Sequence, residues 1–177
     1  MDFVEPRLVL GELALTPGAK VGDFGAGTGV FALLMAHAVG AEGRVYAFDI
    51  QKELLAHLTD EASRERLTNI ETLWSNLEKP GGTKLADGVL DAALVANIMF
   101  QVEDRESFVR EVVRTVKPGG KILVLDWSES FGGLGPQPES VVSLEKAQAL
   151  FTRERCTLSR ENKAGGHHYV AVFSKST

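Results

Sequence analysis

The chain has 177 residues with 19 basic and 24 acidic side chains, a formal net charge of −5, and 44% of its residues are hydrophobic. This length and apolar content predict a single domain over residues 1–177 with a real core, and they exclude an intrinsically disordered chain. One cysteine excludes a disulfide framework and a cysteine-rich metal site, so no metal is expected, and the acidic balance disfavours a general nucleic-acid binder.

The start of the chain, residues 1–5, is acidic, whereas a secretory signal peptide begins with basic residues. The longest uninterrupted apolar run, residues 30–36, is far shorter than the roughly 20 residues needed to cross a bilayer. The sequence therefore predicts a cytoplasmic protein without membrane insertion.

Short β-type runs alternate with helical patterns along most of the chain. Helices are expected over residues 6–13, 28–39, 51–64 and 105–116, and strands over residues 20–24, 44–49, 70–74, 90–96 and 121–127. Asp104 is the expected N-cap of the fourth helix, which should stop at Lys-Pro-Gly-Gly, residues 117–120. Strands alternating with helices predict a parallel sheet covered on both faces.

The pattern changes after residue 127. A helix is expected over residues 141–151, followed by two strands at residues 156–162 and 167–174. The segment between these strands, Lys-Ala-Gly-Gly at residues 163–166, is typical of a hairpin connection. The two last strands should therefore be antiparallel.

A glycine-rich turn separates the first strand from the helix that follows it, with glycines at positions 25, 27 and 29. Glycines permit a tight turn and the close approach of a ligand, and the helix start beyond them exposes free N–H groups. The second strand ends at Asp49, where nucleotide-binding folds carry the acidic partner of ribose hydroxyls. This arrangement predicts a nucleotide-type ligand.

The glycine spacing separates two classes of ligand. A dinucleotide fingerprint is Gly-x-Gly-x-x-Gly, whereas here the spacing is Gly-x-Gly-x-Gly and Val30 occupies the position of the third dinucleotide glycine. Short-chain oxidoreductases also need Tyr-x-x-x-Lys, and neither Tyr46 nor Tyr169 is followed by lysine at that distance. An NAD(P)-dependent oxidoreductase is therefore the weaker alternative.

The sequence resembles the class I S-adenosylmethionine-dependent methyltransferases. Their first motif, an acidic residue, one spacer and Gly-x-Gly-x-Gly, is matched by Asp23, Gly25, Gly27 and Gly29. The resemblance continues over Asp49 and over segments that match the family's fourth strand, its Lys-Pro-Gly-Gly turn and its closing strand, namely residues 94–101, 117–120 and 168–173. The nearest subgroup is similar to small bacterial and archaeal methyltransferases related to the quinone-biosynthesis C-methyltransferases.

The resemblance implies an α/β fold with a Rossmann-like, doubly wound seven-stranded sheet, mostly parallel with an antiparallel last strand. It implies S-adenosyl-L-methionine as the cofactor. Within the glycine turn, which includes Gly29, the residues Gly25, Ala26 and Gly27 would lie under the methionine portion. Asp23 would orient that portion through water.

The remaining implied contacts lie beyond the first motif. Asp49 would take both ribose hydroxyls and Ile50 would pack on the adenine. After the third strand the family usually has an acidic residue facing the adenine amino group, and this chain has Asn76, followed by Leu77. Two further residues, Asn97 and Gln101, would flank the methionine end and the methyl group.

The expected function is methyl transfer from S-adenosylmethionine to a small-molecule acceptor. Nucleic-acid amino methyltransferases carry Asn/Asp-Pro-Pro-aromatic after the fourth strand, and residues 97–100, Asn-Ile-Met-Phe, lack both prolines, so DNA is not expected. Arsenite methyltransferases resemble this group but use several cysteines, whereas the chain has Cys156 alone. A non-catalytic S-adenosylmethionine-binding module is the first alternative. The accepting atom, a general base and the oligomeric state are left open by the sequence.

Overall fold

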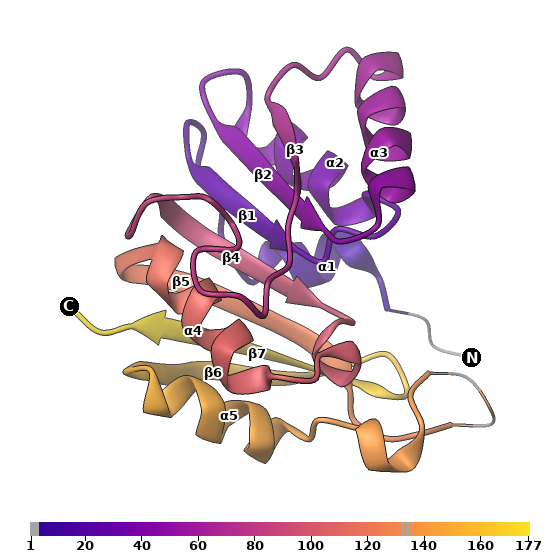
Figure 1. Ribbon diagram of the computed structural model, residues 1–177, viewed down its shortest axis with the longest axis vertical. Coiled ribbons are helices and arrows are strands. Elements are labelled where there is room, and N and C mark those ends of the chain that lie inside the picture. Colours follow the sequence, from indigo (N-terminus) through magenta and orange to yellow (C-terminus); the bar gives the residue numbers. More distant parts are fainter. Residues whose placement is uncertain (1–3, 132, 134) are drawn as a thin grey trace.

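Seven strands make up the framework of the computed structural model, which describes residues 4–131, 133 and 135–177. They are β1 (Lys20–Phe24), β2 (Arg44–Asp49), β3 (Ile70–Trp74), β4 (Leu90–Ala96), β5 (Val116–Trp127), β6 (Cys156–Ala164) and β7 (His168–Lys175). They form one sheet in the order β3-β2-β1-β4-β5-β7-β6 (Figure 1). Pairing from β3 to β5 is parallel, and β7 is antiparallel to both β5 and β6. The predicted doubly wound sheet with an antiparallel last strand is confirmed.

The first four strands have the predicted bounds, whereas β5 begins earlier than expected. Its pairing with β4 moves from Leu90 opposite Val116 to Ala92 opposite Lys121. The Lys-Pro-Gly-Gly segment is therefore a bulge within the strand rather than a turn before it, and Gly119 adopts a φ of +76° there.

The helices are α1 (Pro6–Gly11), α2 (Val30–Val39), α3 (Lys52–Arg64), α4 (Arg105–Thr115) and α5 (Leu144–Arg153), with 3₁₀ turns η1 (Met99–Gln101) and η2 (Pro138–Ser140). Asp104 caps α4 as predicted, because its Oδ1 accepts the Ser107 N–H at 3.0 Å. The Ser143 hydroxyl caps α5, which therefore starts later than the predicted residue 141. Of the described helices, none has the length and apolar character that crossing a membrane requires.

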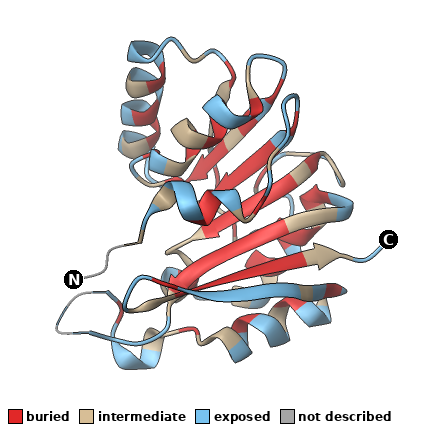
Figure 2. Ribbon diagram, turned by 180° about the vertical axis from the view of Figure 1, so that it is seen from behind, coloured by how far each residue is buried: buried red, intermediate tan, exposed pale blue. Residues whose placement is uncertain are grey.

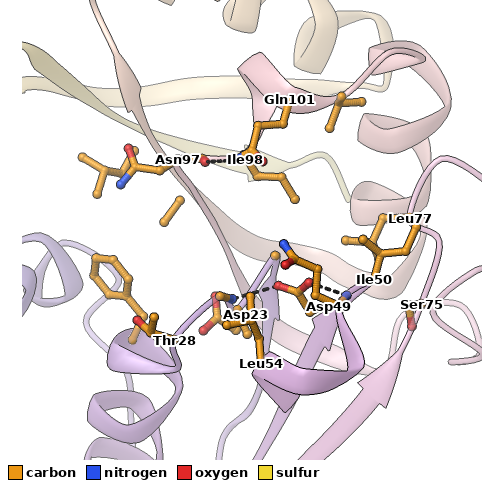
Figure 3. A pocket seen from close by; sticks show the side chains of 18 of the residues that line it. Asp23, Thr28, Asp49, Ile50, Leu54, Ser75, Leu77, Asn97, Ile98 and Gln101 are labelled. Atoms are coloured by element: carbon orange, nitrogen blue, oxygen red, sulfur yellow. Dashed lines mark hydrogen bonds between the residues drawn. The ribbon is translucent and has the colours of Figure 1, made fainter. Parts of the chain in front are cut away.

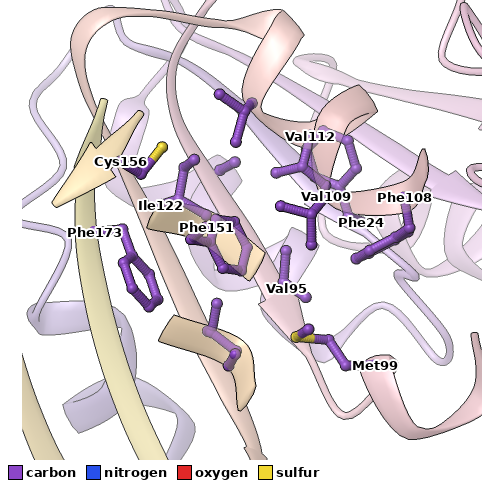
Figure 4. Close-up of a cluster of buried hydrophobic side chains, with 14 of the residues drawn as sticks. Phe24, Val95, Met99, Phe108, Val109, Val112, Ile122, Phe151, Cys156 and Phe173 are labelled. Atoms are coloured by element: carbon purple, nitrogen blue, oxygen red, sulfur yellow. The ribbon is translucent and has the colours of Figure 1, made fainter. Parts of the chain in front are cut away.

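Helices cover both faces of the sheet, and each face carries its own buried cluster (Figures 1 and 2). Under α4 and α5, Phe108 and Phe151 are fully buried, and the Phe151 ring stacks on Phe173 of β7 at 4.6 Å (Figure 4). On the opposite face, Met35 of α2 belongs to the same cluster as Leu94 of β4. Burying one such side chain stabilises the fold by roughly 2–3 kcal/mol.

The winding of the chain determines where a ligand can bind. From β1 the chain proceeds through β2 to β3 at one edge, then returns to place β4 on the other side of β1. In open α/β sheets, a crevice forms at the carboxyl ends of the strands where the winding direction reverses. This point lies between β1 and β4.

Candidate functional site

A cavity of about 630 Å³ opens at the carboxyl ends of β1, β2 and β4 (Figure 3). All the predicted cofactor residues except Gly29 line it: Asp23, Gly25, Ala26, Gly27, Asp49, Ile50, Asn76, Leu77, Asn97 and Gln101. The sheet topology thus brings together residues that are far apart in the sequence.

The three glycines of the turn after β1 have different physical roles. The φ angles of Gly25, Gly27 and Gly29 are +85°, +53° and +87°. Residues other than glycine adopt such positive φ angles only at an energetic cost. A Cβ at Gly25 would lie 2.3 Å from Cδ1 of Ile98, and one at Gly29 would lie 2.5 Å from Cδ1 of Leu58. Gly29 therefore permits close packing of α2 on α3, which explains why it does not line the cavity.

Gly27 differs from its neighbours because the space around it is open. A Cβ built on Gly27 meets no heavy atom of the described residues within 4 Å. The residue lines the cavity, and its N–H is held by the carboxylate of Asp49 at 2.9 Å. The turn therefore exposes its backbone to a ligand at Gly27.

Asp49 ends β2 and is buried. Its Oδ2 accepts the Gly27 N–H and its Oδ1 accepts the Gln51 N–H, each at 2.9 Å. Each carboxylate oxygen has a second lone pair, so both oxygens keep the capacity to accept one further hydrogen bond.

Asp23 lies at the end of β1 beside Asp49 and is 1% exposed. Its Oδ2 finds no hydrogen-bond partner among the described residues. Burial, together with the charge of Asp49, raises the pKa of Asp23 to about 7, although the backbone N–H of Ala32 acts in the opposite direction. A cationic group in the cavity would favour the ionised form of this carboxyl.

The segment that follows β3 supplies another wall of the cavity. Ser75 is 2% exposed, and its hydroxyl has no partner among the described residues. The Asn76 side-chain oxygen accepts the Glu78 N–H at 3.1 Å, so the oxygen expected to face a ligand also stabilises a local turn. Sequence reasoning missed Ser75, because a single serine after a strand carries no distinguishing pattern.

The loop after β4 forms the facing wall. Asn97 has a φ of +53°, its N–H donates to Leu125 at 2.8 Å, and its buried Oδ1 has no partner in the described structure. Gln101 donates its side-chain N–H to the Asn97 carbonyl at 3.0 Å, and its backbone N–H donates to the Ile98 carbonyl at 2.8 Å, which closes η1. Ile98 packs over Gly25 and connects this wall to the glycine turn.

The charged side chains that line the cavity are all acidic among the described residues. Its lining holds three carboxylates, Asp23, Asp49 and Glu78, and none of its described residues is Lys, Arg or His. Other lining residues not predicted from the sequence are mostly apolar: Val4, Pro6, Thr28, Val30, Phe31, Gln51, Leu54, Ala96, Ile98, Val102, Phe108 and Leu125. In the described part of the chain, no three His, Cys, Asp or Glu side chains gather as a metal site would require.

The sequence profile of a family described as a methyltransferase domain matches residues 22–124. This range covers more than half of the chain and includes the glycine turn, Asp49 and the loop after β4. The chain belongs to the class I S-adenosylmethionine-dependent methyltransferases. The predicted family and its cofactor are thereby confirmed.

Two curated methyltransferases illustrate the relationship. The chain is 35% identical over 118 residues to an arsenite methyltransferase of Aquipseudomonas alcaligenes, covering 64% of this chain and 34% of that protein. It is 30% identical over 129 residues to the ubiquinone/menaquinone biosynthesis C-methyltransferase UbiE of Shewanella sediminis, covering 70% of this chain and 48% of that protein. The chain thus spans less than half the length of these relatives.

A solved methyltransferase matches almost the whole fold. The crystal structure of an S-adenosylmethionine-dependent methyltransferase from Aquifex aeolicus has a TM-score of 0.87 and 26% identity, covering 97% of this chain and 90% of that chain.

The hydrogen-bonding groups of the cavity fit S-adenosylmethionine, the cofactor of the family. The ligand presents a sulfonium and an ammonium group, ribose hydroxyls and an adenine amino group, all of which seek negative charge or acceptor oxygens. The cavity offers unpartnered oxygens at Asp23, Ser75 and Asn97 and spare lone pairs at Asp49. Backbone N–H groups at the start of α2, which has no side-chain cap, suit the ligand carboxylate.

Proposed function

We propose that the chain binds S-adenosylmethionine and transfers its methyl group to a small organic acceptor, with residues 1–177 acting as one methyltransferase domain. The observation that carries the proposal is the acidic cavity, lined by Asp23, Asp49 and Glu78 and by no basic residue of the described chain. The negative charge of these side chains attracts a ligand with a permanent positive charge, and it would repel the pyrophosphate of NAD(P). The oxidoreductase alternative is therefore disfavoured.

The proposal assigns the nucleoside half of the cofactor to the ends of β2 and β3. Asp49 accepts the two ribose hydroxyls with the lone pairs left free by its two backbone contacts. Ile50, which is 56% exposed beside the cavity, provides an apolar surface for the adenine. Ser75 and Asn76 face the polar edge of the base, and Leu77 packs beside it.

The methionine half is assigned to the glycine turn. Gly25, Ala26 and Gly27 give the backbone surface under it, and the free N–H groups at the start of α2 receive its carboxylate. The ionised form of Asp23 balances its ammonium group.

When bound, the cofactor supplies an electrophilic methyl group on a sulfonium. The chain's own contribution is to align the acceptor with that methyl group and to exclude water. Ile98, Phe31 and Leu125 form an apolar lining, and the amides of Asn97 and Gln101 orient the acceptor through hydrogen bonds. Neither amide takes up a proton near neutral pH, so an acceptor that carries a proton on the attacking atom must bind already deprotonated or release that proton to solvent.

An organic acceptor is favoured over arsenite. Methylation of a thiophilic arsenic(III) species calls for accessible thiolates, and the chain has one cysteine. Cys156 is 2% exposed and does not line the cavity, and burial raises the pKa of its thiol to about 11. The Asn-Ile-Met-Phe segment at residues 97–100 also argues against a DNA base as the acceptor.

Calorimetric titration tests the cofactor assignment. We expect micromolar binding of S-adenosylmethionine and S-adenosylhomocysteine and none of NAD, with binding lost in Asp49→Ala. Asp91→Ala is the matched control, because Asp91 bonds Lys20 and Lys117 and does not line the cavity. Binding of NAD in place of S-adenosylmethionine, or equal losses in both variants, would refute the assignment.

Turnover separates an enzyme from a binding module. S-adenosylhomocysteine release is measured with a panel of hydroxylated and quinoid aromatics, amines, thiols, arsenite, RNA and protein. The proposal expects turnover with at least one organic acceptor. Turnover with arsenite, RNA or protein alone would overturn the acceptor class, and tight cofactor binding without turnover on any acceptor would favour the non-catalytic module.

A further inference from the structure

The wall assigned to the nucleobase begins a long segment without regular secondary structure. Residues 75–89 connect β3 to β4 and contain no helix. The first four residues of this segment, 75–78, line the cavity. Its middle contains Gly81 and Gly82, whose backbones have high conformational freedom, so other contacts must hold the wall in one shape.

Glu111 of α4 supplies these contacts. Its Oε1 accepts the Thr83 N–H at 3.0 Å and the Thr83 hydroxyl at 2.6 Å, and its Oε2 accepts the Gly81 N–H at 3.0 Å. The carboxylate also pairs with Arg114, whose Nη2 and Nε donate to it at 2.8 and 2.9 Å. Glu111 is 2% exposed, so these bonds form away from water, where they are strongest.

The charge of Glu111 is well compensated. Burial alone would raise the pKa of this carboxyl, but hydrogen bonds from Arg114, Thr83 and Gly81 lower it to about 2. Glu111 is therefore ionised at neutral pH, and its bonds to the loop are charge-assisted.

Close contacts within the loop connect Gly81 and Thr83 to the wall. Gly82 lies against Asn76 so closely that a Cβ would be 2.0 Å from the Asn76 carbonyl oxygen. The Lys79 N–H donates to the same oxygen at 3.2 Å, and the Gly82 N–H donates to Lys79 at 2.8 Å. A shift at the Glu111 contacts would therefore displace Asn76.

A second contact joins α4 to the same wall. The Asp104 N–H donates to Glu78 Oε2 at 2.7 Å. Asp104 and Glu111 are seven residues apart, close to two helical turns, so they lie on one face of α4. Phe108 lies between them, is fully buried and lines the cavity. This side of α4 thus contacts both Glu78, at the end of the wall, and the loop that follows it.

We propose that Glu111 is a positioning residue for the nucleobase end of the cofactor, holding the wall of residues 75–78 from behind. This inference rests on the proposed function. Glu111 does not line the cavity, so its effect on binding is exerted through Gly81 and Thr83.

The test is calorimetric titration of Glu111→Gln with two ligands, at a temperature where circular dichroism shows the variant folded. The ligands are S-adenosylhomocysteine and its inosine analogue, in which an oxo group replaces the adenine amino group. We expect affinity for the adenine ligand to fall about tenfold, because small displacements of positioning groups have effects of this size or larger. The preference of the wild type for adenine over inosine should shrink with it.

Val112→Ala is the matched control, since Val112 is fully buried on the same helix but packs in the core away from the cavity. It should lower thermal stability while keeping the adenine preference. If Glu111→Gln does not fold, Thr83→Val, which removes the 2.6 Å bond, should reduce affinity about threefold.

The outcomes are distinguishable. An unchanged affinity and adenine preference in folded Glu111→Gln overturns the inference alone, as does an equal loss of preference in Val112→Ala. Absence of S-adenosylhomocysteine binding by the wild type overturns the proposed function as well.

Discussion

The carboxylate of Asp49 accepts the backbone N–H of Gly27 at 2.9 Å, so the end of the second strand holds the turn that follows the first. One side chain thereby shapes the glycine turn and borders the cavity into which that turn opens. A change at Asp49 is expected to alter both regions together.

The glycines of the turn should respond differently to alanine. Gly27→Ala places its methyl group in open cavity space, so we expect a stability loss of about 1–2 kcal/mol from the positive φ and a strong loss of cofactor binding. Gly25→Ala clashes with Ile98 and should destabilise the protein more. Chemical denaturation and calorimetry measure the two effects, and a Gly27→Ala variant that binds like the wild type would contradict the assignment.

Asp23 should make stability depend on pH. The pKa of its carboxyl is about 7 in the folded protein against an ordinary value of 3.8, so between these values the folded state binds more protons than the unfolded chain. The free energy of unfolding contributed by this group is therefore present at low pH and falls as the pH rises toward 7.

Asp23→Asn removes this dependence because its side chain stays neutral. Without ligand, we expect the melting temperature of the variant to exceed that of the wild type by roughly 10 °C at pH 8, and to match it closely at pH 4. Thermal unfolding monitored by circular dichroism gives the comparison. A difference of the same size at both pH values would exclude the titration of Asp23 as its cause.

Ser75→Ala separates binding from folding. The Ser75 hydroxyl is buried without a partner among the described residues, so its removal should leave stability unchanged or raise it by up to about 1 kcal/mol. Affinity for S-adenosylhomocysteine should nevertheless fall several-fold if this hydroxyl meets the adenine edge. Ser63→Ala, on the exposed side of α3, is the control, and equal affinity in both variants would remove Ser75 from the binding site.

Ligand binding should also stabilise the fold. At a hundredfold excess over its dissociation constant, S-adenosylhomocysteine should add about 2.7 kcal/mol to the free energy of unfolding. NAD at the same concentration should add nothing. Differential scanning calorimetry gives both values, and equal shifts with the two ligands would contradict a selective cavity.

Local patterns were sufficient to predict much of the fold and of the cavity. The glycine turn and Asp49 lie within one strand–helix–strand unit, and their spacing predicted both the turn and the strand end. The hydrophobic pattern predicted that α5 starts at residue 141. The helix starts later because Ser143 is its N-cap. Val4 and Pro6 also line the cavity, and this depends on how the segment before β1 folds back against the sheet, which no local pattern specifies by residue.

The contacts of Glu111 illustrate why other parts of the site could not be predicted from the sequence. Glu111 is separated from Thr83 by 28 residues and from Gly81 by 30. On a helix, Glu111 and Arg114 are indistinguishable in sequence from an ordinary exposed ion pair at i and i+3. The two side chains can bond to residues 81–85 only because α4 packs beside the segment that connects β3 to β4.

This separation along the chain also has a consequence for the order of folding. The strands β1 to β3 precede Glu111 in the sequence, so during synthesis they can pair before α4 has left the ribosome. The segment at residues 75–83 can acquire its contacts with Glu111 only after α4 has been made. We expect the amide hydrogens of Gly81 and Thr83 to exchange with solvent at the rate at which α4 detaches, and thus to report on the assembly of the cavity in the mature protein.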